Sequence, residues 1–272
     1  MNLDRAKAAL TGTRFADLRH VTVTGSTNAD VPRLLAERLP EHAPARPLVL
    51  VADHQTAGRG RLDRIWEDEP GSSLLVSIAV GLAGIAEDRW TLVPAAVGVA
   101  AVDACATTRL KWPNDLVVPN PDADGADLKV GGILTEMVDV EGAGPFAVVG
   151  VGINLNWHAI PPDLTATATS LDEVLGGAVD REVVLLDLLV GLDQRWLPLI
   201  EVLAVPTDEF LGAYRARSAT LGRRVRVELT GAELIGAAVD IDSGGGLVIE
   251  DDQRVRRTVG VGDVVHLRSA AG

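Results

Sequence analysis

Residues 52–66 read A-D-H-Q-T-A-G-R-G-R-L-D-R-I-W, and the predicted fold is organised around this stretch. The apolar run 48–52 precedes it and predicts a strand that ends where two glycines alternate with arginines. Glycine lets a backbone approach a ligand closely, and the planar guanidinium of arginine suits phosphate and carboxylate groups. Three arginines within six residues form a local positive island in a chain with formal net charge -13. On these residues alone, an anion-binding loop and a solvated surface loop both remain open.

The composition is that of a globular protein with a sizeable core. The chain has 272 residues, of which 47% are hydrophobic, so it needs no disulfides to bury apolar surface. The single cysteine, Cys105, lies in an alanine-rich stretch, which indicates a buried side chain in a reducing cytoplasm rather than a nucleophile. The excess of acidic over basic residues, 38 against 25, argues against general nucleic-acid binding. The uncharged runs 70–86 and 142–162 are interrupted by polar residues, glycine or proline, so we expect no membrane span.

The pattern of apolar residues changes near Ser218. Before it, strands and helices alternate, which predicts a mixed α+β domain over residues 1–218. The expected strands are 21–23, 48–55, 72–80, 128–139 and 146–156, and the expected helices are 28–39, 88–106, 181–203 and 208–216. Pro94 marks either a late start or a kink in the second of these helices, and Asp180 suits the N-cap of the third. After it, five short β runs follow one another, mostly separated by glycine, which predicts a small barrel over residues 219–272. These runs are 223–229, 232–240, 246–250, 253–259 and 263–268.

Polar residues stand at two of the expected strand ends. Ser26 and Thr27 precede a helix, where they suit capping, and free N–H groups at a helix start also suit a polar or anionic ligand. Taken alone, the stretch 25–28 is explained by capping. Gln55 ends the strand before the glycine loop, so its amide offers a small ligand both a donor and an acceptor.

The stretch 110–116, L-K-W-P-N-D-L, predicts a tight turn between two strands. Lys111, Asn114 and Asp115 are costly to bury together unless they have partners. A functional site meets this condition, and a charged hairpin tip in solvent is the alternative.

Two later strands carry glycines on one face. Strand alternation places Lys129, Gly131 and Ile133 together, and it places Gly150 and Gly152 beside Asn154. Missing side chains open space for a ligand or allow a helix to pack closely. The strand pattern alone does not separate these two readings.

Together these motifs resemble the biotin protein ligases, in order and spacing, over residues 20–268. The closing residues Gly262, Asp263, Leu267 and Arg268 also resemble the end of that family. Five stretches carry the resemblance: Gly25-Ser26-Thr27-Asn28, Gln55 through Trp66 with its G-R-G-R core, Lys111-Trp112-Pro113-Asn114-Asp115, Lys129 through Leu134, and Gly150 through Asn154.

The resemblance implies a mixed-sheet catalytic domain followed by an SH3-like barrel. It implies a two-step reaction in which biotin and ATP, with Mg²⁺, give biotinyl-5′-AMP and pyrophosphate. A lysine of the biotin carboxyl carrier domain of an acyl-CoA carboxylase then takes the biotinyl group. Some members carry a DNA-binding domain ahead of the S-T-N motif. Residues 1–19 are too few for one, so we expect a monofunctional enzyme, a monomer or weak homodimer, without a DNA-binding role.

The resemblance also implies roles for single residues, with Lys129, Arg59 and Arg61 as the catalytic cations. The expected biotin site is Ser26, Thr27, Asn28, Gln55, Arg59, Gly60, Arg61, Lys129, Gly131 and Gly132. The expected ATP site is Arg59, Arg64, Trp66, Lys111, Asn114, Asp115 and Asn154. Metal ligands stay open, with Asp115 holding either the metal or Lys111. Leu62 and Asp63 depart from the basic or glycine residues of the family loop, which puts its closure and adenylate retention in question.

Two other functions remain as alternatives. A lipoyl- or octanoyl-transferring enzyme would share the catalytic fold, but the G-R-G-R and K-W-P-N-D pair and the C-terminal β region favour biotin. A module that binds biotin without turnover would release no pyrophosphate.

Overall fold

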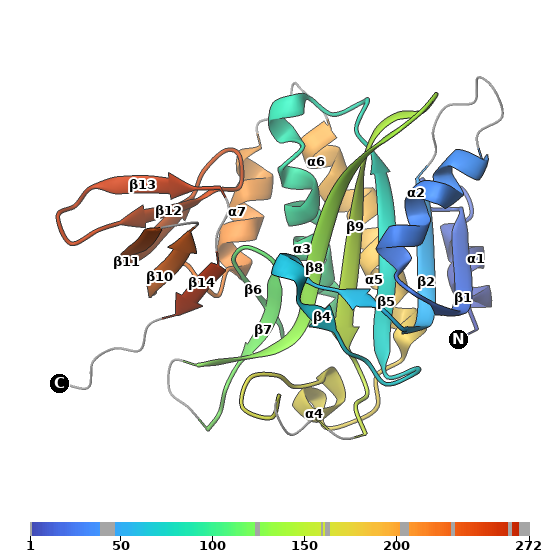
Figure 1. Ribbon diagram of the computed structural model, residues 1–272, viewed down its shortest axis with the longest axis horizontal. Coiled ribbons are helices and arrows are strands. Elements are labelled where there is room, and N and C mark those ends of the chain that lie inside the picture. The colour runs from blue at the N-terminus through green and yellow to red at the C-terminus, as the bar shows by residue number, and fades with distance from the viewer. Residues whose placement is uncertain are drawn as a thin grey trace.

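The computed structural model describes residues 2–38, 47–122, 126–158, 160, 164–201, 207–229, 232–260 and 263–266. A seven-stranded sheet forms the N-terminal part, and a five-stranded sheet lies beside it (Figure 1). The larger sheet has the order β1-β2-β5-β9-β8-β7-β6, with β1 and β2 parallel and the other pairs antiparallel. Its strands are β1 (Leu18–Thr24), β2 (Leu48–Gln55), β5 (Ser73–Gly81), β6 (Arg109–Lys111), β7 (Asp115–Pro119), β8 (Asp127–Val140) and β9 (Gly144–Asn154). This mixed sheet confirms the predicted α+β class.

Helices cover both faces of the larger sheet. One hydrophobic cluster joins helices to strand residues such as Val49 and Val51, while a second joins Val31 of α2 to Leu48 and Leu50. Residues 48–52 are therefore buried on both faces of β2. The helices are α1 (Asp4–Leu10), α2 (Thr27–Arg38), α3 (Leu92–Cys105), α4 (Leu171–Leu175), α5 (Arg181–Gly191), α6 (Leu197–Glu201) and α7 (Asp208–Arg217).

Local sequence explains where two of these helices begin. Helix α3 begins at Leu92, later than predicted, and Pro94 lies in its first turn, where its missing N–H costs nothing. Asp180 caps α5 by accepting from the N–H groups of Glu182 at 2.9 Å and Val183 at 3.4 Å. A π-helical turn then connects α5 to α6. The predicted helix ends at 39 and 203 lie outside the described residues.

The five C-terminal runs all form strands, in the order β13-β12-β11-β10-β14. They are β10 (Arg224–Leu229), β11 (Ala232–Ile241), β12 (Leu247–Glu250), β13 (Arg256–Val259) and β14 (Asp263–His266). Among the described residues, β13 and β14 form the two edges of this sheet and do not pair, so the predicted barrel stays a prediction. Gly262, Leu267 and Arg268 lie outside the described residues.

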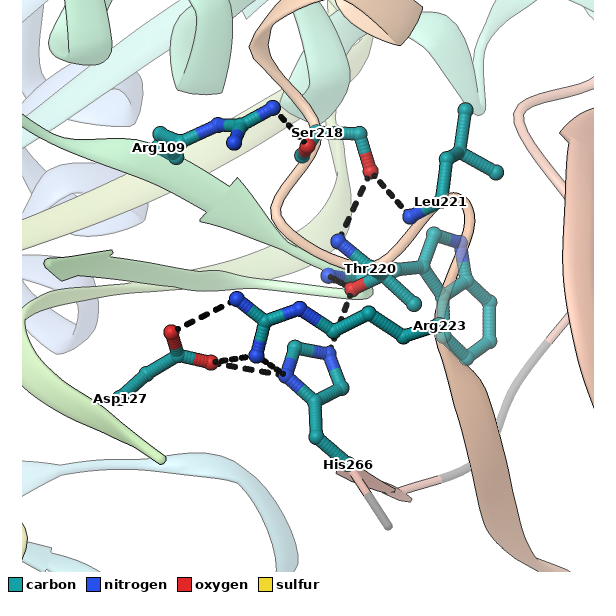
Figure 2. Close-up of polar contacts among 8 residues, drawn as sticks. Arg109, Asp127, Ser218, Thr220, Leu221, Arg223 and His266 are labelled. Atoms are coloured by element: carbon teal, nitrogen blue, oxygen red, sulfur yellow. Dashed lines mark hydrogen bonds and ion pairs between the residues drawn. The ribbon is translucent and has the colours of Figure 1, made fainter. Parts of the chain in front are cut away.

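A buried polar cluster joins the two sheets (Figure 2). Asp127, the first residue of β8, accepts two hydrogen bonds from the Arg223 guanidinium, at 3.0 and 3.1 Å. His266 Nδ1 lies 2.7 Å from the same carboxylate, and its Nε2 lies 3.1 Å from the Thr220 hydroxyl. That hydroxyl accepts from the N–H of Trp112 at 3.0 Å, so the cluster reaches the K-W-P-N-D turn. We call Asp127, Thr220, Arg223 and His266 the junction cluster.

None of the helices in the described part of the chain is long and apolar enough to span a membrane.

Candidate active site

A pocket of about 350 Å³ brings the sequence motifs together. It lies between the start of α2, the glycine loop, the K-W-P-N-D turn and the glycine-bearing strands. Fourteen predicted residues line it: Ser26, Thr27, Asn28, Gln55, Arg59, Gly60, Arg61, Arg64, Trp66, Lys111, Asn114, Asp115, Lys129 and Gly132. Gly131 and Asn154 lie outside this lining in the described part of the chain.

The start of α2 forms one polar wall. Gln55 Oε1 accepts from the Thr27 N–H at 2.7 Å and from its hydroxyl at 3.0 Å, which locks the two motifs together. Ser77 on β5, fully buried, lies 2.7 Å from Thr27 Oγ1 and 2.6 Å from Asn28 Oδ1. Buried hydroxyl and amide groups are held in fixed orientation when they have such partners. This wall therefore presents preorganised donors and acceptors.

The glycine loop folds into a short hairpin of β3 (Gly58–Arg59) and β4 (Ile65–Trp66), joined by a 3₁₀ turn at Arg61–Asp63. Only glycine fits at position 58, because an added Cβ would lie 2.6 Å from the Trp66 carbonyl oxygen. Figure 1 shows the hairpin crossing β8 and β9. The hairpin thus covers one side of the pocket.

The Trp66 ring fills the hollow that the glycines leave. A Cβ on Gly152 would lie 2.7 Å from this ring, and one on Gly132 would lie 3.3 Å from it. Gly150 makes room for Asn28 instead, whose Oδ1 would lie 2.5 Å from an added Cβ. Close packing is therefore confirmed at Gly150, which the helix residue Asn28 covers, and Trp66 packs in the same way on Gly152. The role of these glycines in admitting a ligand stays a prediction. The Trp66 Nε1 is buried and has no hydrogen-bond partner among the described residues.

A β-bulge decides which way Lys129 points. Leu116 pairs with Gly131 and Val117 with Lys129, so one extra residue separates the two pairs on β8. The bulge reverses the alternation, and the Lys129 ammonium would lie 3.2 Å from a Cβ on Gly132. The predicted shared face of Lys129, Gly131 and Ile133 was wrong for this reason. Gly131 instead packs with its backbone against the carbonyl oxygen of Gly152.

Cationic groups outnumber carboxylates in the pocket. Of the residues that the structure describes, five cations line it, Arg59, Arg61, Arg64, Lys111 and Lys129, against two carboxylates, Asp115 and Glu228. Lys129 pairs with Asp115 at 2.7 Å, and Arg61 donates to the amide oxygen of Asn114 at 3.1 Å. Arg59 pairs with Glu136 at 2.8 Å, at the pocket edge. In a chain of net charge -13, this cavity is a local site for anions.

Comparisons with known proteins agree with this arrangement. The profile of the Biotin/lipoate A/B protein ligase family matches residues 21–154, and that of the Biotin protein ligase C terminal domain matches residues 220–267. A biotin–[acetyl-CoA-carboxylase] ligase of Mycobacterium tuberculosis is 37% identical, over 94% of this chain and 91% of the relative. This chain belongs to the biotin/lipoate A/B protein ligase family.

Two further members of the family show how far the likeness extends. The bifunctional ligase/repressor BirA of Bacillus spizizenii is 30% identical, over 79% of this chain and 65% of its own length. The structure of a biotin protein ligase from Aquifex aeolicus in complex with biotin and ATP has a TM-score of 0.74 and 27% identity. It covers 94% of this chain and 100% of that one.

The sequence reasoning missed several residues of this family member's site. Ser77 and Glu136 carry no motif of their own, although Glu136 follows the K-V-G-G-I-L stretch on the same strand. Glu228, Val264 and Val265 line the pocket from β10 and β14. No local signal marks them, because only the packing of the second sheet brings them to the cavity.

The described residues provide little for a resident metal. They contain no group of three or more His, Cys, Asp or Glu side chains placed to hold a metal ion. Asp115, the candidate ligand, pairs with Lys129, a partner that the sequence did not indicate. Cys105 is buried as predicted, and burial raises the pKa of its thiol to about 12, which suits a packing role.

Proposed function

We propose that this protein is an ATP-dependent biotin protein ligase. It forms biotinyl-5′-AMP from biotin and ATP and transfers the biotinyl group to a lysine of a biotin carboxyl carrier domain of an acyl-CoA carboxylase. The observation that carries this proposal is the pocket itself, where five cations from the G-R-G-R loop, the K-W-P-N-D turn and β8 meet. The 37% identity to a biotin–[acetyl-CoA-carboxylase] ligase supports the choice of substrate and acceptor.

The first step joins two anions. A carboxylate oxygen of biotin attacks the α-phosphorus of ATP, the bond to the β-phosphate breaks, and pyrophosphate leaves. Like charges repel along this path, so fixed positive charge in a shielded site lowers the barrier. Lys129, Arg59 and Arg61 supply that charge in our proposal. No side-chain nucleophile is needed.

The second step breaks the new anhydride. The acceptor lysine, as the free amine, attacks the acyl carbon, AMP leaves, and the amine loses a proton as the amide forms. The same cations stabilise the departing phosphate. Because the anhydride is also open to water, the hairpin over the pocket protects it until an acceptor arrives.

We assign the polar wall to biotin and the turn side to the nucleotide. Ser26, Thr27, Asn28 and Gln55 match the donors and acceptors of a ureido ring, with Gly60 and Gly132 leaving room beside them. Trp66 and Arg64 flank the adenine and phosphates, with Lys111, Asn114 and Asp115 opposite. ATP enters as its magnesium complex, whose ion takes phosphate oxygens and water, so a protein cage is unnecessary. Gly131 and Asn154 support the floor from outside the lining.

We further propose that residues 1–218 form the catalytic domain and residues 219–272 a C-terminal domain of SH3-like barrel type. The change from mixed sheet to consecutive antiparallel strands after Ser218 supports this boundary. We expect a monomer or weak homodimer in the cytoplasm, with no part in DNA binding.

Pyrophosphate release, measured with biotin and with lipoate, tests the proposal. Release with biotin and ATP, followed by labelling of an added carrier domain, is the expected result. Release with lipoate alone would indicate a lipoate-transferring enzyme. Biotin binding without release would indicate a binding module.

A further inference from the structure

The glycine loop leaves and rejoins the sheet at two neighbouring points. The Gly71 N–H donates to the Asp53 carbonyl oxygen at 2.8 Å, which closes the base of the loop. The segment between them carries seven pocket residues: Gln55, Arg59, Gly60, Arg61, Arg64, Ile65 and Trp66. Whatever holds this base therefore sets where the whole cationic hairpin lies.

Arg181 holds both ends of that base. It is the first residue of α5, and only 13% of its side chain is exposed. Its guanidinium donates to Asp53 Oδ1 at 3.0 Å, to the Ala52 carbonyl at 3.5 Å and to the Gly71 carbonyl at 3.2 Å. One planar guanidinium thus contacts both β2, where the loop begins, and the turn at Gly71, where the loop ends.

The surroundings keep this guanidinium in place. The Asp53 carboxylate also lies 2.9 Å from His20 Nε2 on β1, so the clamp is tied to the edge of the sheet. Asp180 caps the same helix turn that carries Arg181. Gly71 has φ +83°, and an added Cβ would lie 3.6 Å from Arg181 Nη1. A side chain at position 71 would therefore be strained and would contact the guanidinium.

We propose that Arg181 is a positioning residue for adenylate formation, acting as the clamp at the base of the glycine-arginine loop. It lies outside the pocket and acts through the loop rather than on the substrates. A small shift at the base becomes a larger one at the arginines, and displacement of about 1 Å from the productive geometry costs up to about 100-fold in rate. The proposal rests on the proposed ligase function only for its kinetic readout.

The test combines kinetics with trypsin cleavage of the loop after Arg59, Arg61 and Arg64. In Arg181→Met we expect kcat for biotin-dependent pyrophosphate release to fall about 10- to 100-fold at saturating substrates. We also expect loop cleavage about tenfold faster than wild type without ligand, and loss of protection by biotin plus ATP. Biotinyl-5′-AMP should also dissociate from Arg181→Met faster than from the wild type.

A matched control separates positioning from general stability. Arg14 is also a partly buried arginine that bridges elements, pairing with Asp193 at 2.6 Å and with Glu201, and it touches neither end of the loop. Arg14→Met should lower the melting temperature while loop cleavage and adenylate retention stay at wild-type values. Arg181→Lys keeps one bond to Asp53 and should give intermediate values for both.

Two results would overturn the clamp. The first is a loop cleavage rate and a kcat in Arg181→Met that equal those of the wild type. If Arg181→Met does not fold, the second is a cleavage rate and a kcat in Arg181→Lys that equal those of the wild type. Absence of pyrophosphate release from the wild-type chain would count against the ligase function instead. The ligand-free cleavage rates would still decide the role of Arg181.

Discussion

The pocket and the junction cluster use the same chemistry in different surroundings. In the pocket, Lys129 pairs with Asp115 and Arg59 with Glu136, and these side chains are 27–45% exposed. In the junction cluster, the Asp127 and His266 side chains are each 4% exposed, and only Arg223, at 29%, reaches solvent to a similar degree as the pocket residues. Figure 2 shows Arg223 and His266 converging on the Asp127 carboxylate.

This difference in burial separates two roles for ion pairs. A half-exposed ion pair contributes little to stability in water. The phosphate or carboxylate of an incoming substrate can therefore replace the acidic partner of the cation at a small cost in free energy. A buried partner cannot leave without stranding a charge. The pocket pairs thus hold cations ready for substrate, while the junction cluster holds β8 against the second sheet.

The largest effect should come from the junction. Asp127→Ala removes the carboxylate that both Arg223 and His266 contact, so we expect a loss of about 3–5 kcal/mol in the free energy of unfolding. Urea denaturation measures it. Asp252→Ala, which breaks an exposed pair with Arg224, serves as the control and should leave stability nearly unchanged. Equal urea midpoints for Asp127→Ala and Asp252→Ala would mean that the junction pair stabilises the fold no more than an exposed pair does.

In the pocket, the effect should fall on rate. Lys129→Ala removes a transition-state cation, so adenylate formation should slow by about 100-fold or more. This corresponds to about 2.7 kcal/mol of activation free energy. Pyrophosphate release measures it, with unfolding by urea as the check on stability. Lys7→Ala, on α1, is the control, and a wild-type rate for Lys129→Ala would make that lysine structural.

Acidification should weaken the junction cluster through His266. Burial, together with Lys111 and Arg223, lowers the pKa of His266 below its ordinary 6.5, although Asp127 opposes this. Between the folded pKa and pH 6.5, His266 is therefore protonated in the unfolded chain and neutral in the folded chain. Stability is complete above pH 6.5 and falls as pH drops toward the folded pKa, by at most about 1.4 kcal/mol per pH unit.

His266→Gln removes this titration, so its unfolding free energy should change less than that of the wild type between pH 7 and 5. Asp127 contributes only in stronger acid. Burial by itself raises the pKa of this carboxyl, but His266 and Arg223 lower it overall, so its stabilisation is lost below its ordinary 3.8. Parallel pH profiles for the variant and the wild type would exclude His266 as the source.

The smallest effect should come from Glu136→Gln. The change keeps an oxygen for Asn28, which donates to Glu136 at 3.0 Å, but it removes the negative charge beside Arg59. If Glu136 pairs with Arg59 only until substrate displaces it, removing its charge should lower the KM values for biotin and ATP by up to about fivefold. Steady-state kinetics measure this, with Glu37→Gln as an exposed control. A rise in KM would mean that Glu136 supports the bound state.

Much of the fold was readable because local rules decided it. Apolar runs and turn residues placed all five C-terminal strands within about three residues, and Asp180 marked the start of α5. The α3 start was misplaced by four residues, since the pattern does not show that Glu87–Arg89 forms a separate 3₁₀ turn. Closure of the C-terminal sheet into a barrel depends on pairing between its two edge strands. The positions of the strands in the sequence do not specify that pairing.

For the site, residue types and their spacing indicated the motifs, since glycines beside arginines and a polar turn after a strand have few structural uses. Through-space packing decided the remainder. The bulge on β8 turned Lys129 toward the floor, the second sheet added Val264 and Val265, and α5 brought Arg181 more than 100 residues along the chain to the loop base. Such contacts join segments distant in sequence, so no local propensity encodes them, and they form only when the whole chain has folded.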